Sequence, residues 1–273
     1  MVRVPGDSFN RRVATGAIEV VESIAFPNSL LPPFSMRRFV GHARWEIGGK
    51  DFRNLGAHLV EKLRDAGLRP QSRVLDIGSG CGRIAIPLTA ILDGEGSYTG
   101  IELSAPLVRW CSSHITRRFP KFTFVHSDIG NGHYNPDGKY DAGSYRFPFP
   151  DSTFDLLVAT SVFTHLLPND TEHYLSECAR VLEPGGQLFA SFYFADAPVT
   201  SSASGLRLES CWGDNAFVAD ESDPEAAIGV KPTWLLQQAS KLGLELVGSI
   251  RRGSWTGGGD GYSGQDVAIF RRT

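Results

Sequence analysis

Short apolar runs alternate with segments of helical periodicity through the middle of the chain. The apolar runs predict buried strands, and the segments in which apolar residues recur every three or four positions predict helices. The pattern predicts a strand just before residue 78, strands near residues 98–102, 122–126, 154–159 and 186–193, and helices near residues 105–118 and 170–181. Such alternation is typical of a parallel sheet that helices cover on both faces.

The beginning of the chain departs from this alternation. Apolar positions at helical spacing start after Asp51, whereas the preceding residues hold an apolar-rich stretch, 17–26, that prolines interrupt. We therefore expect an N-terminal arm or cap over residues 1–50 and one larger domain over residues 51–273.

Local signals refine the ends of several elements. Asn169 followed by Glu172 has the capping-box pattern, which predicts that the helix near 170–181 begins there. Ile84, Leu88 and Ile91 predict the buried side of another helix. Near the end of the chain, a glycine-rich link joins two apolar runs, which predicts a hairpin of strands at 244–247 and 266–270.

Residues 74–82 read Val-Leu-Asp-Ile-Gly-Ser-Gly-Cys-Gly and join the first strand to the following helix. Gly78, Gly80 and Gly82 stand at alternate positions, where the lack of side chains lets the backbone take positive φ angles and approach a ligand closely. The start of the helix behind them favours electron-rich groups. With Asp76 just before the glycines, this segment predicts a turn that binds a nucleotide cofactor.

The spacing of this turn differs from that of dinucleotide-binding proteins. A pyrophosphate site has its third glycine five positions after the first, and Arg83 stands at that position here. Glu102 ends the next strand, where its carboxylate can accept hydrogen bonds from both hydroxyls of a ribose. Asp128 follows the third strand, where it can accept from an adenine amino group. The pattern favours a cofactor with an amine, a ribose and an adenine but no pyrophosphate.

At these positions the chain resembles the class I S-adenosylmethionine-dependent methyltransferases. The resemblance rests on residues 74–82, Glu102 and Asp128, and it continues through residues 147–158 and 180–188. It implies an α/β fold with a doubly wound, mostly parallel seven-stranded sheet whose last strand is antiparallel (a Rossmann-like methyltransferase fold). It also implies S-adenosylmethionine as cofactor and S-adenosylhomocysteine as product. The cofactor-binding residues expected on this basis are Asp76, Gly78, Ser79, Gly80, Gly82, Glu102, Leu103, Asp128, Ile129 and Thr160.

Two insertions leave the sheet at the edge where open α/β sheets bind ligands. Residues 130–146 are rich in tyrosine, and residues 195–231 contain tryptophan and an acidic run. We predict that they form the acceptor pocket and its lid, although long insertions can also be plain surface loops. Aromatic rings with a polar tip suit such a site, unless they only anchor the loops. The candidate acceptor-binding residues are Tyr134, Tyr145, Trp212 and Trp255.

His165 is the candidate catalytic base. It follows the fourth strand within residues 159–166, and histidine titrates in the range that suits proton transfer near neutral pH. The alternative is a histidine that flanks a helix and bonds only to backbone. Methyl transfer from a sulfonium needs nucleophile and methyl held close and collinear in a dry site. A base at His165 would take the proton of a hydroxyl acceptor.

Composition excludes several classes of partner. The net charge is −3, which provides no overall attraction to nucleic acid or to an anionic membrane. Four cysteines without metal or redox spacing favour free thiols in a reducing cytoplasm: Cys81, Cys111, Cys178 and Cys211. We expect no metal site, no signal peptide and no membrane span.

These observations favour one function and leave three alternatives. We predict O-methylation of a small molecule, such as a sugar or secondary metabolite, by direct displacement. The tyrosine-rich insertion, residues 163–165 and the tail segment 253–257 resemble bacterial methyltransferases of glycan and secondary-metabolite pathways. N-methylation of a small molecule comes next. The other two alternatives are an NAD-dependent oxidoreductase and a non-catalytic cofactor-binding protein. The oligomeric state is left open, with a homodimer as one option.

Overall fold

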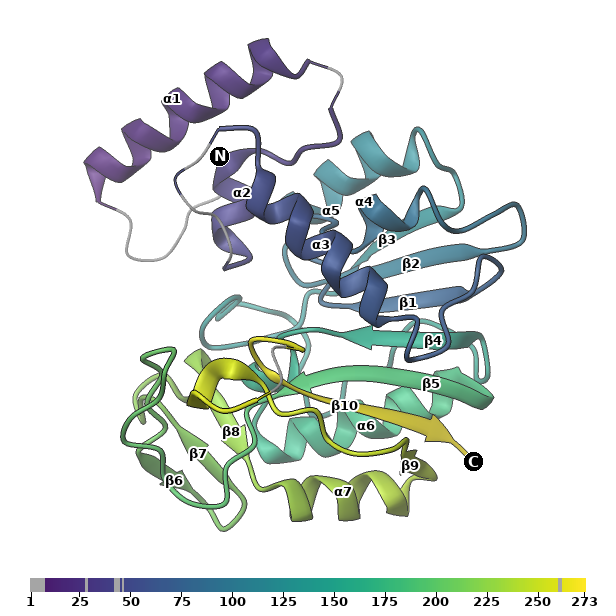
Figure 1. Cartoon of the computed structure of the whole chain (residues 1–273), viewed down its shortest axis with the longest axis vertical. Coiled ribbons are helices and arrows are strands. Elements are labelled where there is room, and N and C mark those ends of the chain that lie inside the picture. Colours follow the sequence, from purple (N-terminus) through teal and green to yellow (C-terminus); the bar gives the residue numbers. More distant parts are fainter. Residues whose placement is uncertain (1–7, 28, 42–44, 46, 260–261) are drawn as a thin grey trace.

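The computed structural model describes residues 8–27, 29–41, 45, 47–259 and 262–273. Seven strands form one sheet in the order β3-β2-β1-β4-β5-β10-β9 (Figure 1). The first five of these pair in parallel, and β10 is antiparallel to both of its neighbours. The strands are β1 Arg73–Ile77, β2 Ser97–Glu102, β3 Phe122–His126, β4 Phe154–Ala159, β5 Leu182–Phe192, β9 Leu244–Leu246 and β10 Asp266–Arg272. The predicted fold class, the hairpin and the antiparallel last strand are confirmed.

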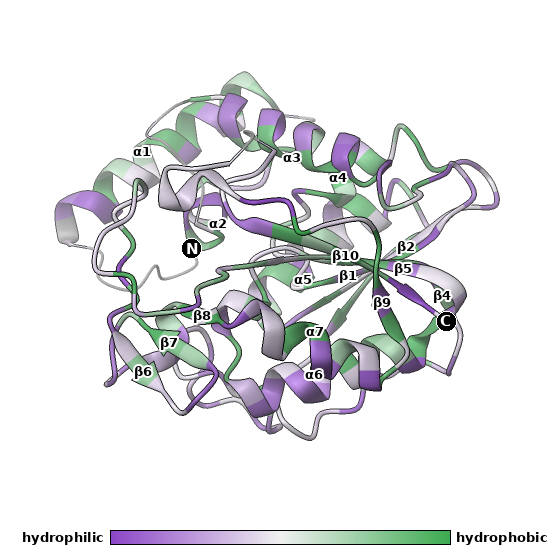
Figure 2. Ribbon diagram, turned by 60° about the horizontal axis from the view of Figure 1, so that its bottom comes forward, coloured by the Kyte–Doolittle hydropathy of each residue, from purple (hydrophilic) through white to green (hydrophobic). Residues whose placement is uncertain are grey.

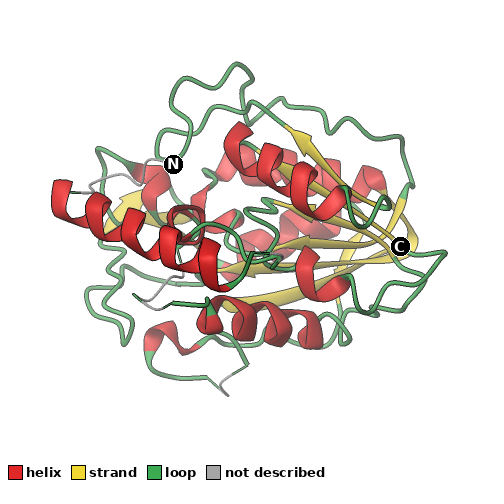
Figure 3. Ribbon diagram, turned by 90° about the horizontal axis from the view of Figure 1, so that it is seen from above, coloured by secondary structure: helices red, strands yellow, loops and turns green. Residues whose placement is uncertain are grey.

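Helices cover both faces of this sheet, as Figure 3 shows. Neighbouring residues of β1 point to opposite faces of the sheet. Val74 packs in the core with α3, α4 and α5, whereas Leu75 packs in the core with α6 and α7. Because a central strand is buried on both faces, its sequence is mostly apolar instead of alternating between apolar and polar residues. The helices are α3 Lys50–Lys62, α4 Ala85–Leu88, α5 Ala105–Cys111, α6 Pro168–Val181 and α7 Pro232–Lys241.

Several predicted element ends are wrong, each for a local reason. The capping box does not form: α6 begins at Pro168, one residue earlier, and Leu167 caps it without a side-chain bond. Proline suits the first helical position because its φ is already helical and its missing N–H needs no partner. The helix after the glycine turn is short, Ala85–Leu88, and β5 starts before the predicted 186, with a register shift opposite Phe154 and Leu156.

The remaining elements lie at the sheet edge where the parallel strands end. The N-terminal arm contributes α1, Phe9–Ala25, and α2, Phe34–Phe39. The insertion 195–231 forms a second, antiparallel sheet in the order β6-β7-β8. Its strands are Ser210–Trp212, Ala216–Val218 and Ile228–Val230. No helix among the described residues combines the length and apolar character needed to cross a bilayer.

Candidate functional site

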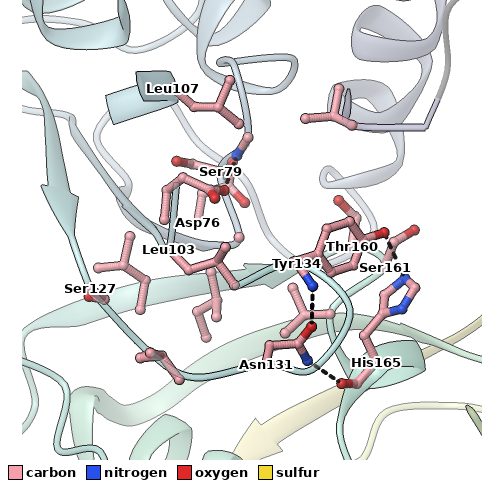
Figure 4. Close-up of a pocket in the computed structure, with 18 of the residues that line it drawn as sticks. Asp76, Ser79, Leu103, Leu107, Ser127, Asn131, Tyr134, Thr160, Ser161 and His165 are labelled. Atoms are coloured by element: carbon pink, nitrogen blue, oxygen red, sulfur yellow. Dashed lines mark hydrogen bonds between the residues drawn. The ribbon is translucent and has the colours of Figure 1, made fainter. Parts of the chain in front are cut away.

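A cavity that is open to solvent lies at the carboxyl ends of β1, β2 and β4 (Figure 4). Four segments wall it: the glycine turn after β1, the end of β2, the start of the insertion 130–146 and the loop after β4. Phe39 and Val40, at the end of α2, close it from the arm. Eight of the ten predicted cofactor-binding residues line this cavity, namely Asp76, Gly78, Ser79, Gly80, Glu102, Leu103, Ile129 and Thr160.

The glycine turn is pressed between the arm and the loop after β4. Gly78 and Gly80 have φ angles of 71° and 55°, which side chains disfavour. A Cβ at Gly80 would lie 2.8 Å from Val40 Cγ1, and one at Gly78 would lie 2.7 Å from Val162 Cγ2. Gly82 is different: it does not line the cavity, and a Cβ there would meet Ile115 at 2.6 Å. The absence of a side chain at Gly82 therefore serves packing against Ile115, and its contact with a cofactor stays a prediction.

Backbone hydrogen bonds hold the Glu102 carboxylate beside the glycine turn. One carboxylate oxygen accepts from the Gly80 N–H at 2.9 Å and the other accepts from the Ser104 N–H at 2.8 Å. Burial raises the pKa of Glu102, and these backbone hydrogen bonds oppose that rise. The carboxylate therefore sits at the turn, where the sequence places the ribose of a cofactor.

Three polar side chains at the glycine turn bury atoms that have no hydrogen-bond partner among the described residues. They are Asp76 Oδ1, Ser79 Oγ, and Arg83 Nε and Nη1, and all three residues line the cavity. Asp76 Oδ2 already accepts from the Tyr98 hydroxyl at 2.5 Å, and desolvation raises the pKa of Asp76 to about 7. Unpaired buried polar atoms are costly and rare. This set, an acceptor beside several donors, suits a zwitterionic ligand.

The predicted adenine acid does not reach the cavity. Asp128 is absent from its walls, where Ser127 and Ile129 stand on either side of it. Its Oδ1 instead accepts from Asn135 Nδ2 at 3.0 Å. Because successive residues of an extended segment point in opposite directions, this hydrogen bond directs Oδ1 into the insertion 130–146. The contact of Asp128 with an adenine stays a prediction.

His165 ends a short helical turn, Phe163–His165, directly after β4, and lines the cavity. Its Nδ1 lies 2.8 Å from the Glu225 carbonyl oxygen, so Nδ1 carries the proton that it donates. Nε2 is left as an acceptor, 3.4 Å from the Tyr134 hydroxyl. Burial lowers the pKa of His165, which favours this neutral form. One nitrogen therefore bonds to backbone and the other is an acceptor in the cavity, and the role of His165 as a base stays a prediction.

Of the four candidate acceptor contacts, only Tyr134 lines the cavity. Its ring packs edge-on against His165 at a centroid distance of 5.0 Å. The other three rings do not line the cavity and have partners elsewhere, so their contacts with an acceptor stay predictions. Tyr145 donates to Ser127 Oγ at 2.9 Å, and Trp212 packs against the main core. The indole N–H of Trp255, a side chain only 3% exposed, donates to Asp266 at 2.9 Å.

Asn131, which the sequence did not single out, joins the parts of this site. Its Nδ2 donates to the His165 carbonyl at 3.1 Å and to Glu225 Oε1 at 2.8 Å. Its Oδ1 accepts from the Tyr134 N–H at 2.9 Å. The Gly132 N–H donates to the same Glu225 carboxylate. One buried amide therefore ties the insertion 130–146, the loop after β4 and the insertion 195–231 together.

We expect Asn131→Ala to lower the free energy of unfolding by about 2–4 kcal/mol, because it leaves several buried groups without partners. Urea unfolding followed by circular dichroism measures the change. Asn169→Ala is the matched control: Asn169 is exposed in α6, so its loss should cost less than about 0.5 kcal/mol. Equal effects of the two substitutions would show that Asn131 does not join these segments.

Comparison with known proteins agrees with this geometry. A family model described as "Methyltransferase domain" matches residues 75–190. An arsenite methyltransferase of Aquipseudomonas alcaligenes is 30% identical over 124 residues, which cover 45% of this chain and 33% of that protein. A 27-O-demethylrifamycin SV methyltransferase of Amycolatopsis mediterranei is 25% identical over 229 residues, covering 82% of this chain and 74% of that protein.

Solved structures share the fold. The 1,6-didemethyltoxoflavin-N1-methyltransferase of Burkholderia thailandensis, crystallised with S-adenosylhomocysteine, superposes with a TM-score of 0.53 and 14% identity over 100% of this chain and 93% of that chain. The chain spans less than half the length of the arsenite methyltransferases that it matches: the aligned part covers 33% of the Aquipseudomonas alcaligenes protein, 35% of the mouse protein and 44% of the rat protein. The glycine turn, the Glu102 carboxylate bonded to it and the match to a methyltransferase domain are consistent with one another. The domain at residues 75–190 belongs to the class I S-adenosylmethionine-dependent methyltransferase family.

Proposed function

We propose that this protein transfers a methyl group from S-adenosylmethionine to a hydroxyl group of a small molecule. The observation that carries the proposal is the state of His165. Its Nε2 is an unprotonated acceptor beside Tyr134, in the same cavity as the glycine turn. A base poised at this position is needed for a hydroxyl, whose proton must leave, more than for a neutral amine.

The residues of the glycine turn fit the cofactor. Glu102 would accept from the ribose hydroxyls, and Asp76 Oδ1 would accept from the ammonium of the methionine part. Arg83 and Ser79, whose buried donors have no partner among the described residues, would hold its carboxylate. Leu103 and Ile129 line the cavity and would provide apolar contacts for the adenine.

The bound cofactor supplies an electrophilic methyl group on a sulfonium, which departs as a neutral thioether. The chain's own residues hold the acceptor and remove its proton. His165 Nε2 would accept the hydroxyl proton while the Glu225 carbonyl keeps Nδ1 protonated. Phe39 and Val40 roof the cavity, so they would exclude water and keep acceptor and methyl at reacting distance.

The relatives named for their substrates bear on the acceptor. The rifamycin enzyme, which by its name methylates an oxygen, aligns over most of its own length and supports a hydroxyl acceptor. Arsenite would need thiolate ligands, because soft thiolates bind soft centres. Three of the four cysteines are buried, burial raises the pKa of the Cys81 thiol to about 12, and the described residues contain no metal-binding cluster of His, Cys, Asp and Glu. These facts favour an organic acceptor.

Calorimetry with S-adenosylmethionine, S-adenosylhomocysteine and NAD tests the cofactor, and release of S-adenosylhomocysteine over matched panels of hydroxyl, amine and arsenite acceptors tests the reaction. We expect binding of both adenosyl compounds, none of NAD, and turnover with hydroxyl compounds. Turnover with amines or arsenite alone would overturn the hydroxyl assignment while leaving methyl transfer in place. Binding of NAD alone would overturn both.

Cofactor binding should depend on pH through Asp76. Its pKa near 7 in the free protein means that the carboxyl is protonated below pH 7, whereas the ammonium needs the ionised form. Binding at lower pH must therefore release a proton, so affinity should rise about tenfold per pH unit from pH 5 to 7 and then level off. Calorimetry across this range measures the slope. Asp76→Asn should bind weakly with no such slope, and a slope retained in this variant would assign the titration to another group.

A further inference from the structure

Helix α1 packs on the rest of the protein with its polar side. Thr15 and Glu22 are buried, and Arg37 of α2 donates to both Glu22 carboxylate oxygens at 2.6 and 2.5 Å. The Ser35 N–H donates to Glu19 Oε1 at 2.8 Å. Figure 1 shows α1 at the outer edge of the molecule, beside α2. An amphipathic helix normally buries its apolar side, and here the reverse holds.

The opposite side of α1 is apolar and faces outward, and Figure 2 shows hydrophobic and hydrophilic residues interspersed along the helix. Val13, Val20 and Ile24 are 57%, 59% and 75% exposed. With Ala17, also exposed, they follow one another at intervals of four, three and four residues, which places them in one row along the helix. We call these four residues the α1 stripe.

Most of the exposed large hydrophobic side chains lie in the arm. Seven of the eight large hydrophobic side chains that are exposed in the described part of the chain lie between residues 13 and 47, and the eighth is Tyr140. A row of exposed apolar side chains such as the α1 stripe often marks an interaction surface.

The α1 stripe is complementary to a second copy of itself running in the opposite direction. In an antiparallel pair centred between residues 18 and 19, Val13 lies opposite Ile24 of the other copy, and Ala17 lies opposite Val20. The small Ala17 side chain permits close approach of the two helices. Two-fold symmetry therefore places the stripe of one copy against the same stripe of the other copy, as an isologous dimer interface requires.

The charges of α1 favour the same pairing. Arg11 and Arg12, both exposed, stand in its first turn, and the helix has neither an acidic residue in that turn nor a basic one in its last turn. Cations at a helix N-terminus oppose the helix dipole. In the antiparallel pair these arginines lie beside the C-terminal carbonyl groups of the other helix, where the dipole favours them.

We propose that α1 forms an antiparallel homodimer contact through the α1 stripe. A stable dimer buries roughly 1,200–2,000 Å² in total. The stripe with its neighbours Val21, Phe26 and Ile47, each also exposed, supplies the apolar centre of such an interface from both copies. The contact would also hold in place the arm whose Phe39 and Val40 close the cavity. The proposal does not depend on the proposed function.

Sedimentation velocity and light scattering at micromolar concentration test the dimer. We expect twice the 29.8 kDa mass of one chain for the unaltered protein and the single-chain mass for Val20→Asp/Ile24→Asp. Tyr140→Asp, at the exposed hydrophobic residue outside the arm, should remain dimeric. Arg11→Glu/Arg12→Glu separates dimer from helix stability: acids suit the N-terminus of α1 itself, so helix content should be kept while the dimer weakens at least tenfold.

The register has its own test. In a Cys211→Ser background, which removes the exposed native thiol, a mixture of Ala17→Cys and Val20→Cys chains should form the mixed disulfide faster on mild oxidation than either variant alone forms its own. A monomeric unaltered protein, or a dimer that persists in Val20→Asp/Ile24→Asp, would overturn the proposal. Binding of the monomeric protein to anionic lipid vesicles would assign the stripe to a membrane surface instead.

Discussion

Replacing Glu102 by alanine will weaken binding of S-adenosylhomocysteine by at least about a hundredfold. A carboxylate that accepts from two ribose hydroxyls makes two charge-assisted hydrogen bonds, each worth roughly 1.5–3 kcal/mol. Glu102 is also held in place before any ligand binds, since its oxygens accept from the Gly80 and Ser104 N–H groups. The ligand therefore meets an ordered acceptor and does not have to organise it. Calorimetry measures the loss.

The design must separate binding from folding, because the alanine variant also leaves two backbone N–H groups without their acceptor. Glu102→Gln keeps the shape, removes the charge and retains one of the two backbone acceptors, so it should lose about tenfold in affinity while its unfolding midpoint falls less than that of the alanine variant. Asp128→Asn is the matched control, since Asp128 lies outside the cavity, and should change affinity less than threefold or so. A larger loss of affinity in Asp128→Asn than in Glu102→Gln would show that Asp128, and not Glu102, is the main carboxylate contact of the cofactor.

The parts of the fold that sequence predicts best are those whose signal is local. The run before residue 78 and the run at 154–159 are mostly apolar because β1 and β4 are central strands with a core on each side. Glycines at alternate positions after β1 likewise predict the turn, because positive φ at Gly78 and Gly80 is a property of the residue itself. Such elements need no knowledge of distant partners.

The site is harder to predict from sequence where a distant partner decides the position of a side chain. Asp128 has the right position in the chain, but its hydrogen bond to Asn135 removes it from the cavity. Trp255 looks like an exposed binding residue in a glycine-rich tail, yet Asp266, only 1% exposed, needs the indole N–H as a donor. A buried carboxylate near the end of the chain therefore determines where that ring lies.

Asn131 shows the reverse case, a residue that the sequence could not identify as important. The side-chain amide of Asn131 donates hydrogen bonds to residues that lie 34 and 94 positions away in the sequence, so no local sequence pattern predicts these bonds. Phe39 and Val40 are similar, because only the packing of the arm brings them to the cavity. The cofactor turn can thus be predicted from the local sequence. The residues that complete the site on the side of the acceptor are brought together by long-range contacts and cannot be predicted in this way.

The largest expected effect on catalysis is at His165. With a hydroxyl acceptor found in the panel described above, His165→Ala should lower kcat by about 10²–10⁴-fold, the usual contribution of a positioned base. Its affinity for S-adenosylhomocysteine should stay within about twofold, because none of the cofactor-holding residues bonds to its imidazole. Single-turnover kinetics at saturating cofactor measures the chemical step without product release.

The pH dependence of kcat distinguishes a base from a structural histidine. Burial lowers the pKa of His165 below its ordinary value of 6.5, so the neutral, proton-accepting form persists at pH 7. At saturating cofactor, kcat should be constant near neutral pH and fall only as the pH drops through that lowered pKa. His165→Ala should lose this acidic limb together with most of its rate.

His133→Gln is the control for that experiment. The His133 ring stacks on His165 at a centroid distance of 6.3 Å and bonds to Asp223 at 2.7 Å, so it shares the surroundings of His165 without lining the cavity. Its loss should lower kcat less than about tenfold, because it removes a neighbouring contact and not the base. If both variants kept their acidic limb and most of their rate, the proton would leave by another route. His165 would then be a residue that joins Glu225 and Tyr134 and takes no part in the chemistry.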